Sequence, residues 1–272
     1  MTEHKHYHPP KDRPVIGLVD EYPAGFVDPN HCHESAQFLF ASAGAMLVTT
    51  EHTSFVIPPQ RALWLPAGAM HSVLCRSAVS LRTLYVDPLY DANPRDCRVL
   101  EVSDFLKALI LEVVKFSDEY DLEGREGRIA WLLLDEIARM PTVPYYLPMP
   151  SNPRLKRVCQ MIAADPADQR DIDAWSSLCG MSRRAFTRAF RQDFGMSFAL
   201  WRQQARLIEA LSLLAIGHSV TSVAFDVGYE SPSAFTAMFR RAFGEPPSLY
   251  LSHTPADESP ASPHAFHSPE EA

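Results

Sequence analysis

The sequence lacks three features that would each place it in a class of protein. It has no apolar run of about 18 residues, the length needed to cross a bilayer. Its first ten residues are polar, unlike those of a signal peptide. Its five cysteines are odd in number and form no CxxC pair, which argues against a disulfide framework or a cysteine-based zinc site. We therefore expect a cytoplasmic protein with reduced thiols and no membrane partner.

The chain also lacks a net positive charge, but its charge is unevenly distributed. The formal net charge is −8. Residues 151–252 carry 12 Lys and Arg against 9 Asp and Glu, whereas residues 1–150 carry 13 against 20, and residues 253–272 carry none against 4. The segment 151–252 is thus the basic one, although its small surplus does not by itself indicate nucleic-acid binding.

The hydrophobic pattern changes its period along the chain, which predicts an α+β protein. Residues 14–86 alternate short apolar segments with Gly and Pro, as in an antiparallel barrel or sandwich. Residues 101–116 and 125–140 have apolar residues at helical spacing, and two such helices need a partner surface. Residues 140–153 contain five prolines and predict an interdomain linker. Beyond them the pattern predicts helices over 153–164, 171–179, 183–193, 197–216, 219–227 and 232–243.

One motif occurs twice in the helical half, at a constant offset of 49 residues. Its members are Ala185, Phe186, Thr187, Phe190, Arg191, Phe194 and Gly195, which recur as Ala234, Phe235, Thr236, Phe239, Arg240, Phe243 and Gly244. The aromatic residues fall at i, i+4 and i+8 and predict a buried stripe, so that the remaining side of each helix faces outward. This outward stripe consists of Arg184, Thr187, Arg188 and Arg191 in the first copy, and of Ser233, Thr236, Ala237 and Arg240 in the second.

Each copy has the features of a helix-turn-helix. A short helix and a glycine precede it, and it opens on a serine suited to cap it, Ser182 or Ser231. The predicted helix 197–216 between the copies would span about 30 Å, close to the ~34 Å of one turn of B-DNA. We therefore expect helices 183–193 and 232–243 to enter two successive major grooves. The alternative, a repeated packing unit that binds no DNA, leaves the outward arginines unexplained.

Residues 151–252 resemble the DNA-binding domain of the AraC/XylS family of bacterial transcription regulators. The resemblance rests above all on the stretch SFALWRQQARLIEALSLLAIGHSVTSVAFDVGYESPSAFTAMFRRAFGEPPSLY. It implies two helix-turn-helix units bridged by a long helix. By position it assigns base contacts in the first unit to Arg184, Thr187 and Arg188, with Arg183 and Arg191 nearer the DNA backbone. In the second unit it assigns contacts to Pro232, Ser233, Thr236 and Ala237, of which Ala237 offers only a methyl group and Pro232 no donor.

Residues 14–86 resemble a cupin barrel, the sensor domain of many such regulators. The resemblance rests on two motifs, which comprise Gly25, His31, His33, Gln37 and Gly44, and Pro66, Gly68 and His71. In metal-binding cupins a glutamate ligand stands where this chain has Gln37. Side chains at 31, 33 and 37 would share one face of an extended strand, and His71 would complete a three-histidine site that suits zinc or another late divalent metal. A metal-free effector pocket or structural histidines are the alternatives, and no cofactor is required.

The barrel also contains aromatic residues that predict a pocket for a small effector. We expect its lining to be Phe38, Phe40, Trp64, His71 and Tyr85, unless these aromatics are simply barrel core. The stretches PPQRALWLPAGAMHSV and LRTLYVDP further resemble a subgroup of these regulators, some of which control neighbouring drug-efflux genes.

Together these features predict a sequence-specific transcription regulator and not an enzyme. It would bind double-stranded DNA, respond to a small-molecule effector, form a homodimer, control a neighbouring efflux or metabolic gene, and contact RNA polymerase if it activates. The alternative is a metal-dependent cupin enzyme, although the carboxylate of the usual oxygenase triad is missing. The expected segments are a flexible tail (1–13), the effector-binding barrel (14–100), a dimerisation segment (101–140), a linker (141–152), the DNA-binding domain (153–252) and a disordered acidic tail (253–272).

Overall fold

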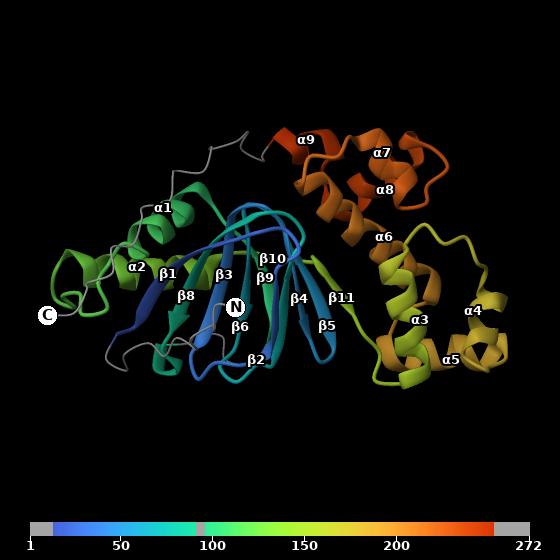
Figure 1. Ribbon diagram of the computed structural model, residues 1–272, viewed down its shortest axis with the longest axis horizontal. Coiled ribbons are helices and arrows are strands. Elements are labelled where there is room, and N and C mark those ends of the chain that lie inside the picture. The colour runs from blue at the N-terminus through green and yellow to red at the C-terminus, as the bar shows by residue number, and fades with distance from the viewer. Residues whose placement is uncertain (1–12, 91–95, 253–272) are drawn as a thin grey trace, which may run out of the picture.

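The computed structural model describes residues 13–90 and 96–252, in which two antiparallel sheets precede a helical half (Figure 1). The six-stranded sheet has the order β1 (Val15–Tyr22), β8 (Val79–Val86), β3 (Ala36–Ala43), β6 (Arg61–Leu65), β9 (Arg98–Glu101) and β10 (Thr142–Val143). The five-stranded sheet has the order β11 (Tyr146–Pro148), β5 (Thr53–Ile57), β4 (Met46–Thr50), β7 (His71–Cys75) and β2 (Val27–His31). The predicted α+β fold is confirmed.

The six-stranded sheet is buried on both faces because alternate residues of its strands point in opposite directions. Leu39 and Leu63 pack with Met46 and Val73 of the other sheet, and they form the interior between the two sheets. The other face is covered by α1 (Asp104–Val113) and α2 (Arg125–Arg139), whose apolar residues pack on the sheet. The two appended helices of the sequence prediction therefore find their partner surface on the barrel itself.

The proline-rich stretch before the helical half pairs with both sheets. β10 pairs with β9, and β11 pairs with β5 through Tyr146 opposite Phe55. Both are edge strands, the position at which a sheet tolerates proline because one side of the strand needs no donor. The prediction of a linker at 141–152 has to be modified accordingly, since part of this segment is strand.

The helical half consists of α3 (Pro153–Ala164), α4 (Ile172–Leu178), α5 (Arg183–Phe194), α6 (Phe198–Ala215), α7 (Val220–Asp226), α8 (Pro232–Phe243) and α9 (Pro247–Ser252). Ser182 and Ser231 cap α5 and α8, as predicted, by accepting hydrogen bonds from backbone N–H groups three residues on. Both helices end at a glycine with positive φ, Gly195 or Gly244. Figure 1 shows α6 running between a group formed by α3, α4 and α5 and a group formed by α7, α8 and α9.

The segment boundaries proposed from the sequence remain predictions. The two predicted tails, residues 1–13 and 253–272, lie outside the described residues except for Arg13. Within the described part of the chain, no helix has the length and apolar character needed to cross a membrane.

Candidate DNA-binding surface and sensor site

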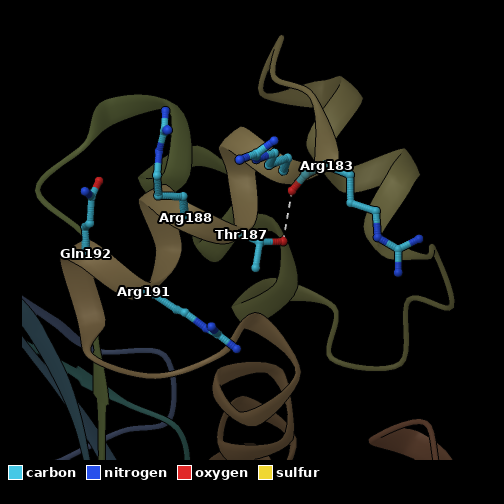
Figure 2. Close-up of a pocket in the computed structure, with 6 residues that line it drawn as sticks. Arg183, Thr187, Arg188, Arg191 and Gln192 are labelled. Atoms are coloured by element: carbon cyan, nitrogen blue, oxygen red, sulfur yellow. Dashed lines mark hydrogen bonds between the residues drawn. The ribbon is translucent and has the colours of Figure 1, made fainter.

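The outward side of α5 carries a cluster of cationic and polar side chains. A hollow on this surface is lined by Arg183, Arg184, Thr187, Arg188, Arg191 and Gln192. Figure 2 shows Arg188 and Gln192 pointing to the same side of the helix, whereas Arg191 points away from them. The hydroxyl of Thr187 donates a hydrogen bond of 2.9 Å to the backbone oxygen of Arg183, which fixes its orientation at the helix surface.

The arginines of α5 differ in their surroundings. The guanidinium of Arg183 forms a 3.1 Å ion pair with Asp173 of α4, and both side chains are exposed. Within the described ranges, Arg184, Arg188 and Arg191 form no such ion pair. Arg183 is thus held toward the first helix of the unit, a position suited to a phosphate contact.

Gln192 is a surface residue that the sequence patterns did not single out. It continues the series Arg184 and Arg188 at a spacing of four residues, so the helical period could have found it. At the 49-residue offset it corresponds to Arg241, which is exposed on α8. The outward stripe of the second helix therefore includes an arginine beyond Arg240.

The second helix presents a weaker cationic surface on the same framework. Pro232 occupies the first turn of α8, and Ser233, Ala237 and Arg240 are exposed, while Thr236 is half-buried. Phe235 and Phe239 are fully buried on its inner side. The predicted outward and inward faces are thus present, and the DNA contacts assigned to these residues remain predictions.

Three histidines converge at one end of the barrel interior. The ligand nitrogens of His31, His33 and His71 all lie within 4.8 Å of one another. His31 ends β2 and lies opposite His71 of β7, with ring centroids 4.3 Å apart, and His33 lies in the following loop. The prediction that residues 31, 33 and 37 share one strand is wrong, because β2 ends at His31 and Gln37 belongs to β3 of the other sheet.

The hydrogen bonds of two of these histidines define which nitrogen faces the cluster. Nδ1 of His71 lies 2.9 Å from the backbone oxygen of Ala69, and Nδ1 of His31 lies 2.7 Å from that of Pro29. Because a carbonyl oxygen only accepts, each Nδ1 carries a hydrogen, and Nε2 holds the free lone pair whenever the ring is neutral. Nε2 of His71 is buried without a hydrogen-bond partner, and burial lowers the pKa of His71, so that this ring is neutral at pH 7.

Polar residues of the other sheet border the cluster. The ring of Tyr85 lies 5.2 Å from that of His33, and Tyr85 stands opposite Gln37 in the β3–β8 ladder. Burial raises the pKa of Tyr85 to about 12, while its hydrogen bond with Gln37 acts in the opposite direction. Oε1 of Gln37 is buried without a hydrogen-bond partner. The carboxylate of Asp28 lies 3.6 Å from Nε2 of His31, and the carboxylates of Asp20 and Asp28 both act to raise the pKa of Tyr85.

The structure does not bring the five predicted pocket residues together. Only His71 and Tyr85 lie on the interior side, whereas Phe38, Phe40 and Trp64 pack against α1 and α2 on the outer face of the six-stranded sheet. The alternation of strand side chains explains the separation, since Phe38 and Phe40 flank the interior residue Leu39.

Comparisons with known proteins agree with both halves of this arrangement. A family described as "AraC-like ligand binding domain" matches residues 14–140, and one described as "Helix-turn-helix domain" matches residues 175–253. The HTH-type transcriptional regulator NimR of Escherichia coli K12 is 32% identical over 224 residues, which cover 82% of each chain. The HTH-type transcriptional regulator RipA of Corynebacterium glutamicum is 38% identical over 114 residues, 42% of this chain and 33% of that one.

Among solved structures, the comparison also finds the unsaturated-fatty-acid-bound ToxT of Vibrio cholerae strain SCE256. It shares 12% identity over 87% of this chain and 94% of that chain, with a TM-score of 0.37. The relatives of known name are transcriptional regulators and not enzymes, so the alternative of a cupin enzyme finds no support. The chain belongs to the AraC family of helix-turn-helix transcriptional regulators, with a ligand-binding domain followed by a DNA-binding domain.

Proposed function

We propose that this regulator contacts two successive major grooves of DNA, one with α5 and one with α8. The observation that carries the proposal is the repetition of a capped helix with one buried aromatic face and one exposed polar face on either side of α6. The 18 residues of α6 extend about 27 Å, a length comparable to the ~34 Å of one turn of B-DNA. Two recognition helices on one rigid connector can therefore follow one side of the duplex.

We propose that some residues of the two helices contact DNA bases and that others contact the DNA backbone. In α5, Arg184 and Arg188 are directed at base edges, where an arginine binds guanine through two hydrogen bonds. Arg183, Arg191 and Arg240 are placed to contact phosphates, which hold the protein in register. In α8, Ser233 and Thr236 offer hydroxyl groups to the DNA, and Ala237 offers a methyl contact for thymine. Pro232 has no donor and contributes only the shape of the helix surface.

Selection of bound fragments from random DNA tests this proposal. We expect two conserved blocks separated by about one helical turn, with stronger sequence preference in the block bound by α5. Binding should also weaken steeply with salt, because phosphate contacts release counterions. Enrichment of a single block, or binding without sequence preference, would contradict the use of both helices.

For the sensor half we propose a divalent metal held by His31, His33 and His71. The residues fit this group: the donors are three imidazoles, and two of them keep Nδ1 bonded to a backbone carbonyl, as metal-binding histidines commonly do. Nε2 of buried His71 has no hydrogen-bond partner among the described residues, and a bound metal would give it one. Zinc or another late divalent metal suits such nitrogen ligands and would order β2 against β7. The alternative, an organic effector in the same space, uses the histidines as hydrogen-bond partners.

Elemental analysis of the purified protein distinguishes these occupants. We expect a bound metal in the wild-type protein and none in the variant His31→Ala/His71→Ala. The variant His52→Ala is a matched control, because His52 is exposed and lies outside the cluster. Equal metal content in all three proteins would contradict the metal, and an organic molecule extracted from the wild type alone would favour the alternative.

We also propose that the outer sides of α1 and α2 form a homodimer interface. Phe105, Trp131 and Leu132 are large apolar residues that remain exposed there, and the ring of Tyr90 packs 5.0 Å from that of Trp131. Burial of such a patch in a second copy would remove it from water. Trp131→Asp should shift the protein to monomers in analytical ultracentrifugation, and an unchanged dimer would exclude this face.

If the regulator activates transcription from the selected site, RNA polymerase is its further partner.

A further inference from the structure

A forked ion pair joins the sensor half to the long helix of the DNA-binding half. The two terminal nitrogens of Arg76 each donate a hydrogen bond of 2.6 Å to one carboxylate oxygen of Glu209 on α6. The two side chains are only 27% and 17% exposed. Such a planar two-bond contact fixes the orientation of its partners more strictly than a single bond does.

The position of Glu209 makes this contact relevant to both recognition helices. Glu209 lies near the middle of α6, and α6 connects the unit that contains α5 with the unit that contains α8. A contact at this point therefore holds both units at once. Any rotation of the helical half against the barrel has to break or stretch the Arg76–Glu209 bonds.

Arg76 is also connected to the histidine site through a single strand. It directly follows β7, whose first residue is His71. Five residues of strand extend about 17 Å. Strand β7 thus connects the histidine cluster directly to the residue that holds α6.

The rest of the boundary between the halves contains both open space and a firm attachment. A groove of about 970 Å³ lies between the five-stranded sheet and the helices α3 and α6, and both Arg76 and Glu209 line it. On the other side, β11 is attached to α6 because Trp201 and Gln204 donate hydrogen bonds to the backbone oxygens of Pro148 and Tyr146. The helical half is thus attached along β11 and through apolar contacts of α6 and α8 with the sensor half, and the ion pair spans the groove.

We propose that the Arg76–Glu209 ion pair sets the orientation of the DNA-binding half relative to the sensor half, and so determines which spacing of half-sites a dimer accepts. This inference rests on the proposed function, because it assumes that the helical half binds DNA and that the sensor halves dimerise. The ion pair contributes nothing to the contacts of one DNA-binding half with its own half-site. Its loss should therefore change the spacing preference and leave half-site affinity unchanged.

The test compares DNA fragments that carry one half-site, or two half-sites at a series of spacings. The full-length variants are Arg76→Glu, Glu209→Arg and the double variant Arg76→Glu/Glu209→Arg, which can re-form the pair with exchanged charges. The control variant is Arg82→Glu, which breaks an ion pair with Glu21 inside the sensor half. Circular dichroism establishes that every variant is folded.

At the optimal spacing we expect the DNA affinity of each single variant to fall at least about fivefold, which is the lower end of the usual coupling between two sites. Each single variant should also bind fragments with other spacings at more similar affinities. The double variant should regain the wild-type preference, and the control should keep it. Single variants with the wild-type preference, a double variant that regains nothing, or a wild type without any spacing preference would overturn the proposal. Failure of the wild type to bind even one half-site would instead overturn the proposed function.

Discussion

The two recognition helices share their packing and differ in their surface. On the inner side, the ring centroids of Phe186 and Phe190 lie 5.5 Å apart, and those of Phe235 and Phe239 lie 5.6 Å apart. On the outer side, α5 has arginines at 184, 188 and 191, whereas the equivalent positions of α8 hold Ser233, Ala237 and Arg240. The buried face thus sets where each helix lies, and the exposed face sets what it can recognise. Equal packing does not imply an equal share of sequence specificity.

Removal of an aromatic ring from either inner face should have the largest effect, and a similar one in both units. Phe190→Ala and Phe239→Ala each create a cavity at a fully buried position, which should cost about 3–5 kcal/mol of folding free energy. Urea unfolding followed by circular dichroism measures this cost. Leu200→Ala is the control, because Leu200 is half exposed and its loss should cost under ~0.5 kcal/mol. A large effect in only one unit would show that the two packings are not equivalent.

Removal of Arg188, the central arginine of α5, should show that the two units differ in base recognition. Arg188→Ala is expected to cost roughly 1–3 kcal/mol of DNA-binding free energy and to relax the preference at one base pair. Binding to a panel of single-base variants of the selected site measures both effects. An equal loss on every sequence in the panel would make Arg188 a phosphate contact instead.

The reciprocal substitution tests whether an added arginine on the exposed face of α8 gives this helix a stronger base preference. Ala237→Arg places an arginine where α5 has Arg188, and we expect it to add a preference for guanine in the second block, again by about 1–3 kcal/mol. The same selection from random DNA measures the new preference. No change in the second block would mean that α8 lies too far from the bases for side-chain length alone to matter.

The phosphate contact proposed for α8 should affect all sequences alike. Arg240→Ala is expected to weaken binding uniformly and to reduce the slope of log affinity against log salt by about 1. Gel-shift titrations at several salt concentrations measure the slope. An unchanged slope with a lost base preference would assign Arg240 to base recognition.

The smallest effect is expected at Asp173. Asp173→Asn removes the exposed partner of Arg183, and such pairs contribute about 0–1 kcal/mol. The second unit lacks this pair, since Ser222 and Pro232 stand at the equivalent positions. We expect DNA affinity to rise by less than ~1 kcal/mol, because Arg183 becomes free to reach a phosphate. A fall in affinity would mean that Asp173 orients Arg183 for DNA.

The features that the sequence predicted correctly depend on local patterns. The duplicated motif, the capping by Ser182 and Ser231 and the two buried aromatic stripes all follow from spacings within a single helix. The strands β10 and β11 were missed because they lie in a proline-rich stretch, and prolines such as Pro148 are typical of turns. Each strand lies at the edge of its sheet, where proline is tolerated.

The remaining differences arise where two elements meet. The aromatics Phe38 and Trp64 could not be assigned to a face, because the strands that carry them are apolar on both sides. The ion pair between Arg76 and Glu209 joins residues 133 positions apart, and no pattern along the chain indicates it. The convergence of His31, His33 and His71 was predicted through a resemblance, and its geometry required the pairing of β2 with β7.

Strand β11 has a consequence for where the chain can be divided. Leu147 is part of the apolar core of the first helix-turn-helix unit, and the buried indole of Trp201 has its hydrogen-bond acceptor on Pro148. A fragment that begins at residue 153 would lose both, and an unsatisfied buried donor alone costs about 1–3 kcal/mol. A stable, independently folding DNA-binding module should therefore begin before Tyr146 and include β11, although β11 is also a strand of the sensor half's five-stranded sheet. Evolutionary exchange of sensor domains would have to preserve this shared segment.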